Sequence, residues 1–348
     1  MSRWLWGTVL AVLLSAPGRA GGLEVVARAA SARRQAAYAA EQLLVVWEGE
    51  RAHSAFVHVQ HDPAVGTRLS YRPVGSGSRR VVWHVRDRTV EYDPRTRAGR
   101  SYRNDPVRAS PQAQLSWLER NYALTWSPTR VLGRDAVHVR VTPRRPGRPR
   151  ADLRVDRRTG VILRSERVSP DGRNRELAVF LNFVPQQAGW MRSVRMPDDL
   201  HLTQEPAAQA VTESEAAARL GQPLPVVWLP PDFSPLTEFL VDGRTGVARR
   251  LYSDGLTTLV LSFRRAGGPI PPAGSRVVFR SGGPVWVQSA GLRHALHWAN
   301  GGWAFTLVGE LSPDVLLEVA DRTGVQPAPS ALQNLLRWLA QAVGWADL

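Results

Sequence analysis

The sequence contains no cysteine and no lysine. Without cysteine, the chain has no disulfide, no thiolate metal ligand and no lipid-modified N-terminal cysteine. Its 45 basic residues are therefore all arginine, and they outnumber the 30 acidic residues to give a net charge of +15. Arginine pairs with carboxylates and phosphates through a planar fork of donors. We expect such a protein to be drawn to anionic surfaces, such as lipid headgroups or an acidic partner.

Long apolar runs are absent after the first 20 residues, so we expect no later membrane anchor. The first 20 residues, by contrast, have the order of features of a secretory signal peptide. Arg3 gives a positive start, Trp4–Leu14 is an apolar run too short to span a bilayer, and Gly18–Ala20 offers small residues at a cleavage site. We therefore expect residues 1–20 to be removed on export. The mature protein is then expected to be periplasmic, soluble and not a lipoprotein.

Arrangements of residues that carry catalysis or hold metals are also missing. The eight histidines are scattered, and His294 and His297 fall three apart in an expected strand, where they would face opposite sides. Ser253 lacks the Gly-x-Ser-x-Gly elbow of a hydrolase. The arginines are spread along the chain apart from Arg144–Arg150, whereas a nucleic-acid-binding surface gathers them on one element. We therefore expect no catalytic residue, no metal site, no cofactor and no nucleic-acid partner.

Alternation of apolar and charged residues predicts short strands between Asp152 and Phe183. Turns at Arg158–Gly160 and Ser169–Gly172 join them, and the last strand, Leu177–Phe183, is apolar enough for a sheet centre. Strands of the same kind recur upstream, with two helices among them. The pattern predicts an α+β protein whose first domain is a long, twisted antiparallel sheet, a half-open barrel that buries helices in its concavity.

The domain boundaries follow changes in this pattern. Residues 21–185 are predicted to hold the first sheet, and the weakly patterned range 186–211 is the predicted linker. A smaller α+β domain is expected over 212–325, and its first helix is predicted from the capping box of Thr212 and Glu215. A final amphipathic helix is expected within 326–348, because leucines recur there at helical spacing.

The 13 tryptophans are informative apolar residues. Most should belong to the core, because tryptophan buries a large area. Some should line a pocket or an interface, where tryptophan is favoured for the same reason. We predict a hydrophobic groove in the first domain lined by Trp47, Phe56, Trp83 and Trp126.

Five short motifs occur in an order that resembles the MucB/RseB family of exported sigma-factor regulators. Each is weak alone, but together they are specific, and they extend over nearly all of the mature chain. Asp232 departs from the family pattern, which has glycine at this place. The five stretches are Gly133–Pro143 (GRDAVHVRVTP), Leu153–Gly172 (with LRVD, TG, LRS and DG), Leu229–Phe233 (LPPDF), Leu251–Leu256 (LYSDGL) and Val308–Glu310 (VGE).

The resemblance implies a first domain like the lipoprotein carrier LolA, which is an unclosed β-barrel that holds helices, and a smaller C-terminal α+β domain. It implies binding to the periplasmic part of a membrane-spanning anti-sigma factor. It also implies sensing of envelope stress through a lipid, a lipoprotein or lipopolysaccharide, and leaves a homodimer open. From the motif match, the predicted binding residues are Tyr252, Ser253, Asp254, Gly255 and Leu256.

Three other interpretations stay open at this point. A lipid or lipoprotein carrier with no sigma-factor role would need a continuous apolar groove in the first domain. A hydrolase of envelope polymers would need two facing carboxylates with perturbed pKa values. A surface-binding module would use a basic face, and its binding would vanish at moderate salt.

Overall fold

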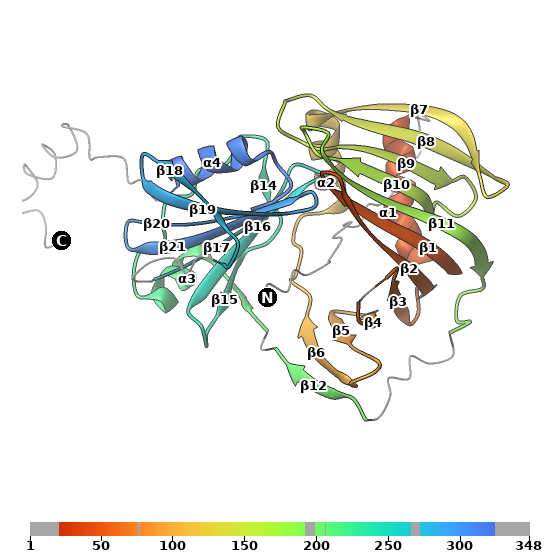
Figure 1. Cartoon of the computed structure of the whole chain (residues 1–348), viewed down its shortest axis with the longest axis horizontal. Coiled ribbons are helices and arrows are strands. Elements are labelled where there is room, and N and C mark those ends of the chain that lie inside the picture. The colour runs from red at the N-terminus through yellow and green to blue at the C-terminus, as the bar shows by residue number, and fades with distance from the viewer. Residues whose placement is uncertain (1–20, 76, 192–198, 206, 266–271, 324–348) are drawn as a thin grey trace, which may run out of the picture.

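The computed structural model describes residues 21–75, 77–191, 199–205, 207–265 and 272–323 of the chain. These residues form two domains that lie side by side, each built on a sheet with helices packed against it (Figure 1). The predicted signal peptide, 1–20, and the predicted C-terminal helix, 326–348, lie outside the described residues. In the part that is described, no helix combines the length and the apolarity that crossing a membrane would require.

The first domain is one sheet of twelve strands in the order β12-β6-β5-β4-β3-β2-β1-β11-β10-β9-β8-β7. Neighbouring strands are antiparallel, except that β12 runs parallel to β6. The strands are β1 (Ala37–Glu48), β2 (Arg51–Asp62), β3 (Gly66–Pro73), β4 (Arg80–Val85), β5 (Arg88–Tyr92), β6 (Ala98–Arg103), β7 (Tyr122–Val131), β8 (Arg134–Pro143), β9 (Arg150–Asp156), β10 (Ile162–Val168), β11 (Asn174–Gln186) and β12 (His201–Gln204).

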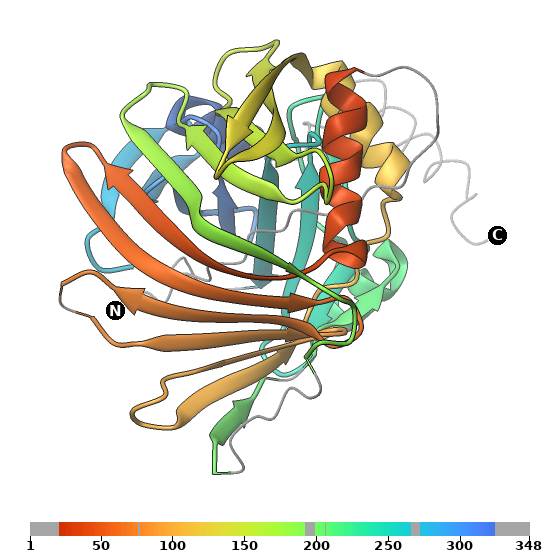
Figure 2. The same ribbon diagram turned by 90° about the vertical axis from the view of Figure 1, so that its right-hand side faces the viewer.

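Two helices pack on the same face of this curved sheet, which we call the inner face (Figure 2). Helix α1 (Gly22–Gln35) is rich in alanine, and its small buried side chains, Ala29 and Ala32, let it lie close to β8, β2 and their neighbours. Helix α2 (Pro111–Asn121) begins where the Ser110 hydroxyl accepts a bond from the Ala113 N–H at 3.1 Å. Apolar residues on alternate strand positions therefore become the core between sheet and helices.

The second domain has a nine-stranded antiparallel sheet in the order β13-β15-β16-β17-β21-β20-β19-β18, with β14 paired to β16 outside this path. Helices α3 (Glu213–Leu220) and α4 (Pro313–Arg322) contribute to its core. The strands are β13 (Gln209–Val211), β14 (Ser234–Pro235), β15 (Phe239–Asp242), β16 (Val247–Ser253), β17 (Thr258–Arg265), β18 (Arg276–Arg280), β19 (Gly283–Ala290), β20 (Arg293–Asn300) and β21 (Trp303–Gly309).

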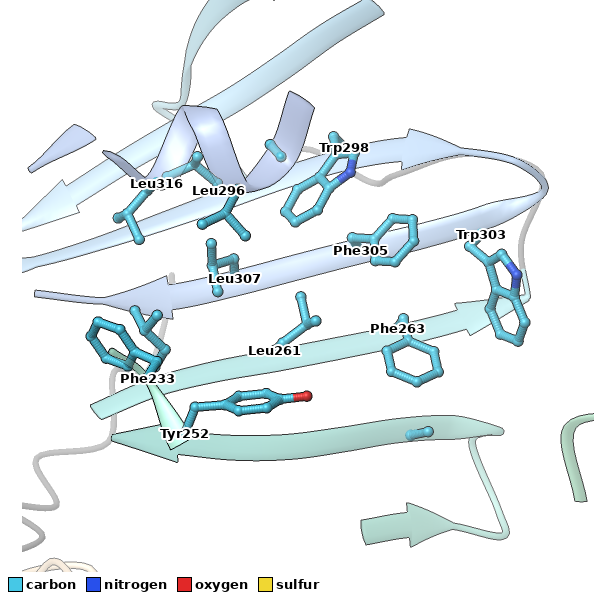
Figure 3. Close-up of a cluster of buried hydrophobic side chains, with 14 of the residues drawn as sticks. Phe233, Tyr252, Leu261, Phe263, Leu296, Trp298, Trp303, Phe305, Leu307 and Leu316 are labelled. Carbon is cyan, nitrogen blue, oxygen red and sulfur yellow. The ribbon is translucent and has the colours of Figure 1, made fainter. Parts of the chain in front are cut away.

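The core of the second domain is aromatic. Figure 3 shows Phe263, Trp298, Trp303 and Phe305 gathered at one end of their strands, and Leu316 of α4 beside Leu296 toward the other end. Trp298 stacks on Phe305 with ring centroids 4.9 Å apart, and Phe263 meets Trp303 edge to face at 5.4 Å. Such pairs stabilise beyond the area that they bury. The second domain therefore has a packed core of its own.

The predicted fold class is confirmed: an α+β chain with a half-open antiparallel sheet around helices, followed by a smaller α+β domain. The meander over β9, β10 and β11 is where the alternation placed it, and β11 lies inside the sheet between β1 and β10. Helix α1 ends at Gln35, because Ala36 is extended and β1 starts at Ala37. The range predicted as a linker, 186–211, includes strands β12 and β13.

Candidate functional site

The Tyr252–Leu256 motif lies between the two domains. Tyr252 and Ser253 end β16, and the side chains of Tyr252, Ser253 and Asp254 are buried. A tight turn follows, in which the Ser253 hydroxyl donates to the Thr257 carbonyl at 2.8 Å. Asp254 Oδ1 accepts from the backbone N–H groups of Leu256 and Thr257 at 3.0 and 2.8 Å. The motif therefore shapes a turn that presents Asp254 to the first domain, and its predicted role in binding a partner stays a prediction.

Asp254 is held by charged and polar side chains of the first domain. The Tyr122 hydroxyl donates to its Oδ2 at 2.7 Å, and Arg148 Nε donates to the same oxygen at 3.3 Å. Arg148 also donates to Asp232, so one guanidinium serves two acidic side chains of the second domain. Burial raises the pKa of the Asp254 carboxyl, although the bonds from Thr257, Tyr122 and Leu256 and the charge of Arg148 act in the opposite direction.

Asn121 binds the backbone of the same two acidic residues of the second domain. Its side-chain amide donates to the carbonyl oxygens of Asp232 and Asp254, at 3.2 and 2.9 Å. Burial, together with the neighbouring charge of Asp254, raises the pKa of the Tyr122 hydroxyl well above its usual value. Tyr122 therefore stays a neutral donor to the carboxylate. We call Asn121, Tyr122, Arg148, Asp232 and Asp254 the joint cluster.

Gly255 of the second domain lies directly against α2 of the first domain. Its φ of +101° lies in a region that side-chain-bearing residues rarely adopt. A Cβ atom at this position would lie 2.3 Å from the backbone nitrogen of Leu118 in α2. Only glycine lets the second domain lie against α2 at this point.

Further contacts around the joint cluster also cross the boundary between the domains. Arg249 pairs with Asp105 at 2.5 Å, Arg108 pairs with Glu238 at 2.5 Å, and Arg167 pairs with Glu310. Of these pairs, Arg167–Glu310 is the most buried, so removing either partner would be costly, whereas the Arg108 side chain is 65% exposed and its pair contributes less. The two domains therefore meet through a specific, polar joint rather than through a loose linker.

An apolar recess of about 370 Å³ opens beside α1 on the inner face. Trp126 is its largest apolar side chain and is 45% exposed. Pockets of a few hundred cubic ångströms with apolar walls and a few polar groups are the usual sites for small ligands. The recess is lined by Gly21, Glu24, Val25, Arg28, Trp126, Val137, Val155, Asp156 and Arg157.

The four residues predicted to line one groove do not lie together. Trp126 pairs with Val139, which packs against α1, so Trp126 is on the inner face. Phe56 lies next to Val57, which packs against Ala32 of α1, so Phe56 points to the opposite, outer face. The ladder from β2 through β3 to β4 places Trp83 on the same outer face, and the ladder with β1 places Trp47 there. Trp126 therefore lies on the other face of the sheet from Trp47, Phe56 and Trp83, and the four side chains do not line one common groove.

The most important residues of the joint were not predicted from the sequence. Asn121, Tyr122 and Arg148 lie 84 to 133 positions from their partners along the chain. Two signals were present: the arginine-rich stretch 144–150, and Asp232 in place of the family's glycine. A new acidic side chain in an otherwise apolar motif needs a basic partner when it is buried.

Among the residues that the structure describes, no group of three or more acidic or histidine side chains is placed to hold a metal ion. His294 bonds to Ser289, whereas His297 bonds to Thr306, so the two histidines have separate partners.

Comparison with known proteins identifies the first domain directly. Residues 23–205 match the model of the MucB/RseB N-terminal domain. No curated protein matches the sequence.

Two solved structures share the fold over most of the chain. In the complex of MucA and MucB from Pseudomonas aeruginosa, the match has 20% identity and a TM-score of 0.55, and covers 88% of this chain and 99% of that chain. In MucB in complex with MucA(peri), the match has 21% identity and a TM-score of 0.55, and covers 87% of this chain and 98% of that chain. Because the family model spans more than half of the sequence, the chain belongs to the MucB/RseB family.

Proposed function

We propose that this protein is an exported, non-enzymatic regulator that binds the periplasmic segment of a membrane-spanning anti-sigma factor. The observation that carries the proposal is membership of the MucB/RseB family, together with a shared fold over both domains with MucB, which was solved in complex with MucA. The signal-like first 20 residues favour the periplasm as the place of action. Binding alone is sufficient for this role.

The joint cluster supports a partner site that depends on both domains. Arg148 and Tyr122 from the first domain hold Asp254 of the second, so the domains present their neighbouring surfaces in one fixed arrangement. A peptide that contacts both domains would bind this arrangement better than any other. Ligand entry could then regulate partner binding only by favouring a different arrangement, because coupling requires a difference in affinity between two states.

The recess beside α1 supports a finer proposal, that the same protein senses an acyl chain. Val25, Val137 and Trp126 offer apolar walls, and Arg28 and Arg157 at its edge suit an anionic headgroup. Helix α1 contacts α2, and α2 meets Gly255 of the second domain. An acyl chain that displaced α1 would therefore act on the helix against which the joint is built.

The partner proposal is tested by affinity purification of the tagged protein from detergent-solubilised cells of its own host. We expect recovery of a single-span membrane protein whose gene lies beside a sigma-factor gene. Arg148→Met, which breaks the joint cluster, should lower recovery, and Arg150→Met, at an exposed position, is its matched control. Recovery of no such membrane protein, together with unchanged envelope-stress signalling in a deletion strain, would overturn the proposal.

A lipid or lipoprotein carrier without a sigma-factor role is the second candidate, and the apolar recess favours it. A carrier should be recovered with lipid bound, and Trp126→Ala should reduce the amount of lipid by about tenfold through loss of the largest apolar wall. Trp190, which is partly buried on the opposite face of the sheet and lies outside the recess, is a tryptophan for a control substitution. A carrier would also keep its lipid when Arg148→Met loosens the joint, which distinguishes it from a regulator.

A further inference from the structure

A stripe of apolar side chains runs across the outer face of the first sheet. Strand register places them side by side: Leu43 lies opposite Phe56 and Val179, and Val45 lies opposite Leu177. Trp47, on the same face of β1, lies opposite Arg175. The outer apolar stripe consists of Leu43, Val45, Trp47, Phe56, Leu177 and Val179.

The outer apolar stripe is partly exposed. Each of its six side chains is of intermediate exposure, and none belongs to a buried cluster formed by the described residues. The other end of the same face is different, because Trp190, Met191, Leu200 and Leu202 pack over Trp83 and its neighbours. A contiguous apolar patch rimmed by polar residues commonly marks a site of interaction.

Arginines surround the stripe on both sides. The Arg175 guanidinium lies over the Trp47 ring at 4.1 Å, and the Arg72 guanidinium lies over the Phe56 ring at 5.2 Å. These contacts hold each cation beside the apolar surface. Arg175 also pairs with Glu166, at 3.3 Å.

A basic hollow of about 240 Å³ continues the same outer face over β8, β9 and β10. Four arginines line it against two carboxylates, an excess of two positive charges. Asp152 is already shared between His138 and Arg140, and Glu166 is shared between Arg164 and Arg175. Arginine in excess of its carboxylate partners favours a phosphate or another oxyanion. The hollow is lined by His138, Arg140, Arg150, Asp152, Arg154, Arg164, Glu166 and Val168.

We propose that the outer face of the first domain docks on an anionic lipid bilayer. The outer apolar stripe enters the headgroup region, and the arginines on its two sides pair with lipid phosphates. Tryptophan, phenylalanine and leucine beside arginine are the combination that proteins use to bind such interfaces. The charge complementarity favours a bilayer over a neutral apolar partner. This surface faces away from α1 and the joint, so docking leaves both accessible.

The proposal is tested by sedimentation with vesicles, using protein recovered from the periplasm of an expressing host. We expect binding to vesicles of phosphatidylglycerol and phosphatidylcholine, little binding to phosphatidylcholine alone, and loss of binding as NaCl is raised. Trp47→Gln and Leu177→Gln should each lower the partition coefficient by about tenfold, because each removes apolar area from the bilayer contact. Phe279→Gln is the matched control, because Phe279 is 80% exposed but lies in the second domain.

Substitution of single arginines tests the electrostatic part of the proposal. Arg154→Gln, in the hollow, should weaken binding severalfold, whereas Arg244→Gln, in a turn of the second domain, should leave it unchanged. Equal binding to both vesicle types would overturn the proposal, as would folded Trp47→Gln and Leu177→Gln variants that bind like the unaltered protein. Loss of anti-sigma binding in these variants, without any vesicle binding, would assign the stripe to a protein partner and would also overturn it.

Discussion

Gly255 decides how closely the two domains approach. Alanine there would place a methyl group 2.3 Å from the Leu118 nitrogen, at a φ of +101°. We expect Gly255→Ala to lower the free energy of unfolding by about 3 kcal/mol, through crowding and backbone strain together. The matched control is Gly246→Ala, since Gly246 has a φ of +64° with no atom within 4 Å of its Cβ position, and should cost about 1 kcal/mol. Equal losses in urea denaturation would contradict the close contact.

Arg148 neutralises two buried carboxylates at the joint. Arg148→Met should cost about 4 kcal/mol, because Asp232 and Asp254 would stay buried without their cation. Tyr122→Phe should cost about 2 kcal/mol, since it removes one donor to Asp254. Arg150→Met, at an exposed position two residues further on, should change stability by less than about 0.5 kcal/mol. A double-mutant cycle of Arg148 and Tyr122 with additive losses would show that the two do not act on one carboxylate.

At the scale of elements, strand β20 carries two histidines that make the second domain sensitive to pH. Burial lowers the pKa of both His294 and His297 below the ordinary value of 6.5. Below about pH 6.5 these histidines therefore become protonated in the unfolded chain before they do so in the folded domain. The free energy of unfolding is highest above about pH 6.5 and decreases as the pH falls below it. Thermal unfolding measured between pH 7.5 and 5 should show this loss, and His297→Gln should reduce it. A flat profile over that range would contradict the buried, neutral histidines.

The strands and turns of this fold follow from local sequence, and the joint does not. Alternation and the turn at Ser169–Gly172 predict the β9–β11 meander, because side-chain period and turn chemistry are properties of neighbouring residues. The capping box of Thr212 and Glu215 predicts α3 for the same reason. The contact of Arg148 with Asp254 spans 106 positions, and nothing local distinguishes this arginine from its neighbours.

Assigning tryptophans to one groove failed for a related reason. Which face a strand residue occupies depends on where its strand begins and how it pairs, and a shift of one position reverses the face. Trp47 and Trp126 share residue type and strand location, but their registers put them on opposite sides of the sheet. Composition shows that the chain has many tryptophans, whereas strand register determines which face of the sheet each side chain occupies.

For the whole molecule, the two faces of the first sheet divide the proposed tasks. The inner face carries the recess, the helices and the joint with the second domain, and the outer face carries the apolar stripe between arginines. A protein that docks on a membrane by one face and binds a membrane-spanning partner by the other would meet that partner at the membrane surface. Confinement of both to one plane raises their effective concentration without any added contact.

The central claim is partner binding, and calorimetric titration of the purified protein with the periplasmic segment of the neighbouring anti-sigma factor tests it most directly. We predict saturable binding of one segment per chain with a dissociation constant of about 1 μM or tighter. Binding should weaken by about tenfold or more in the Gly255→Ala variant and stay unchanged in Gly246→Ala. An absence of saturable heat from protein that is folded by circular dichroism would contradict the claim.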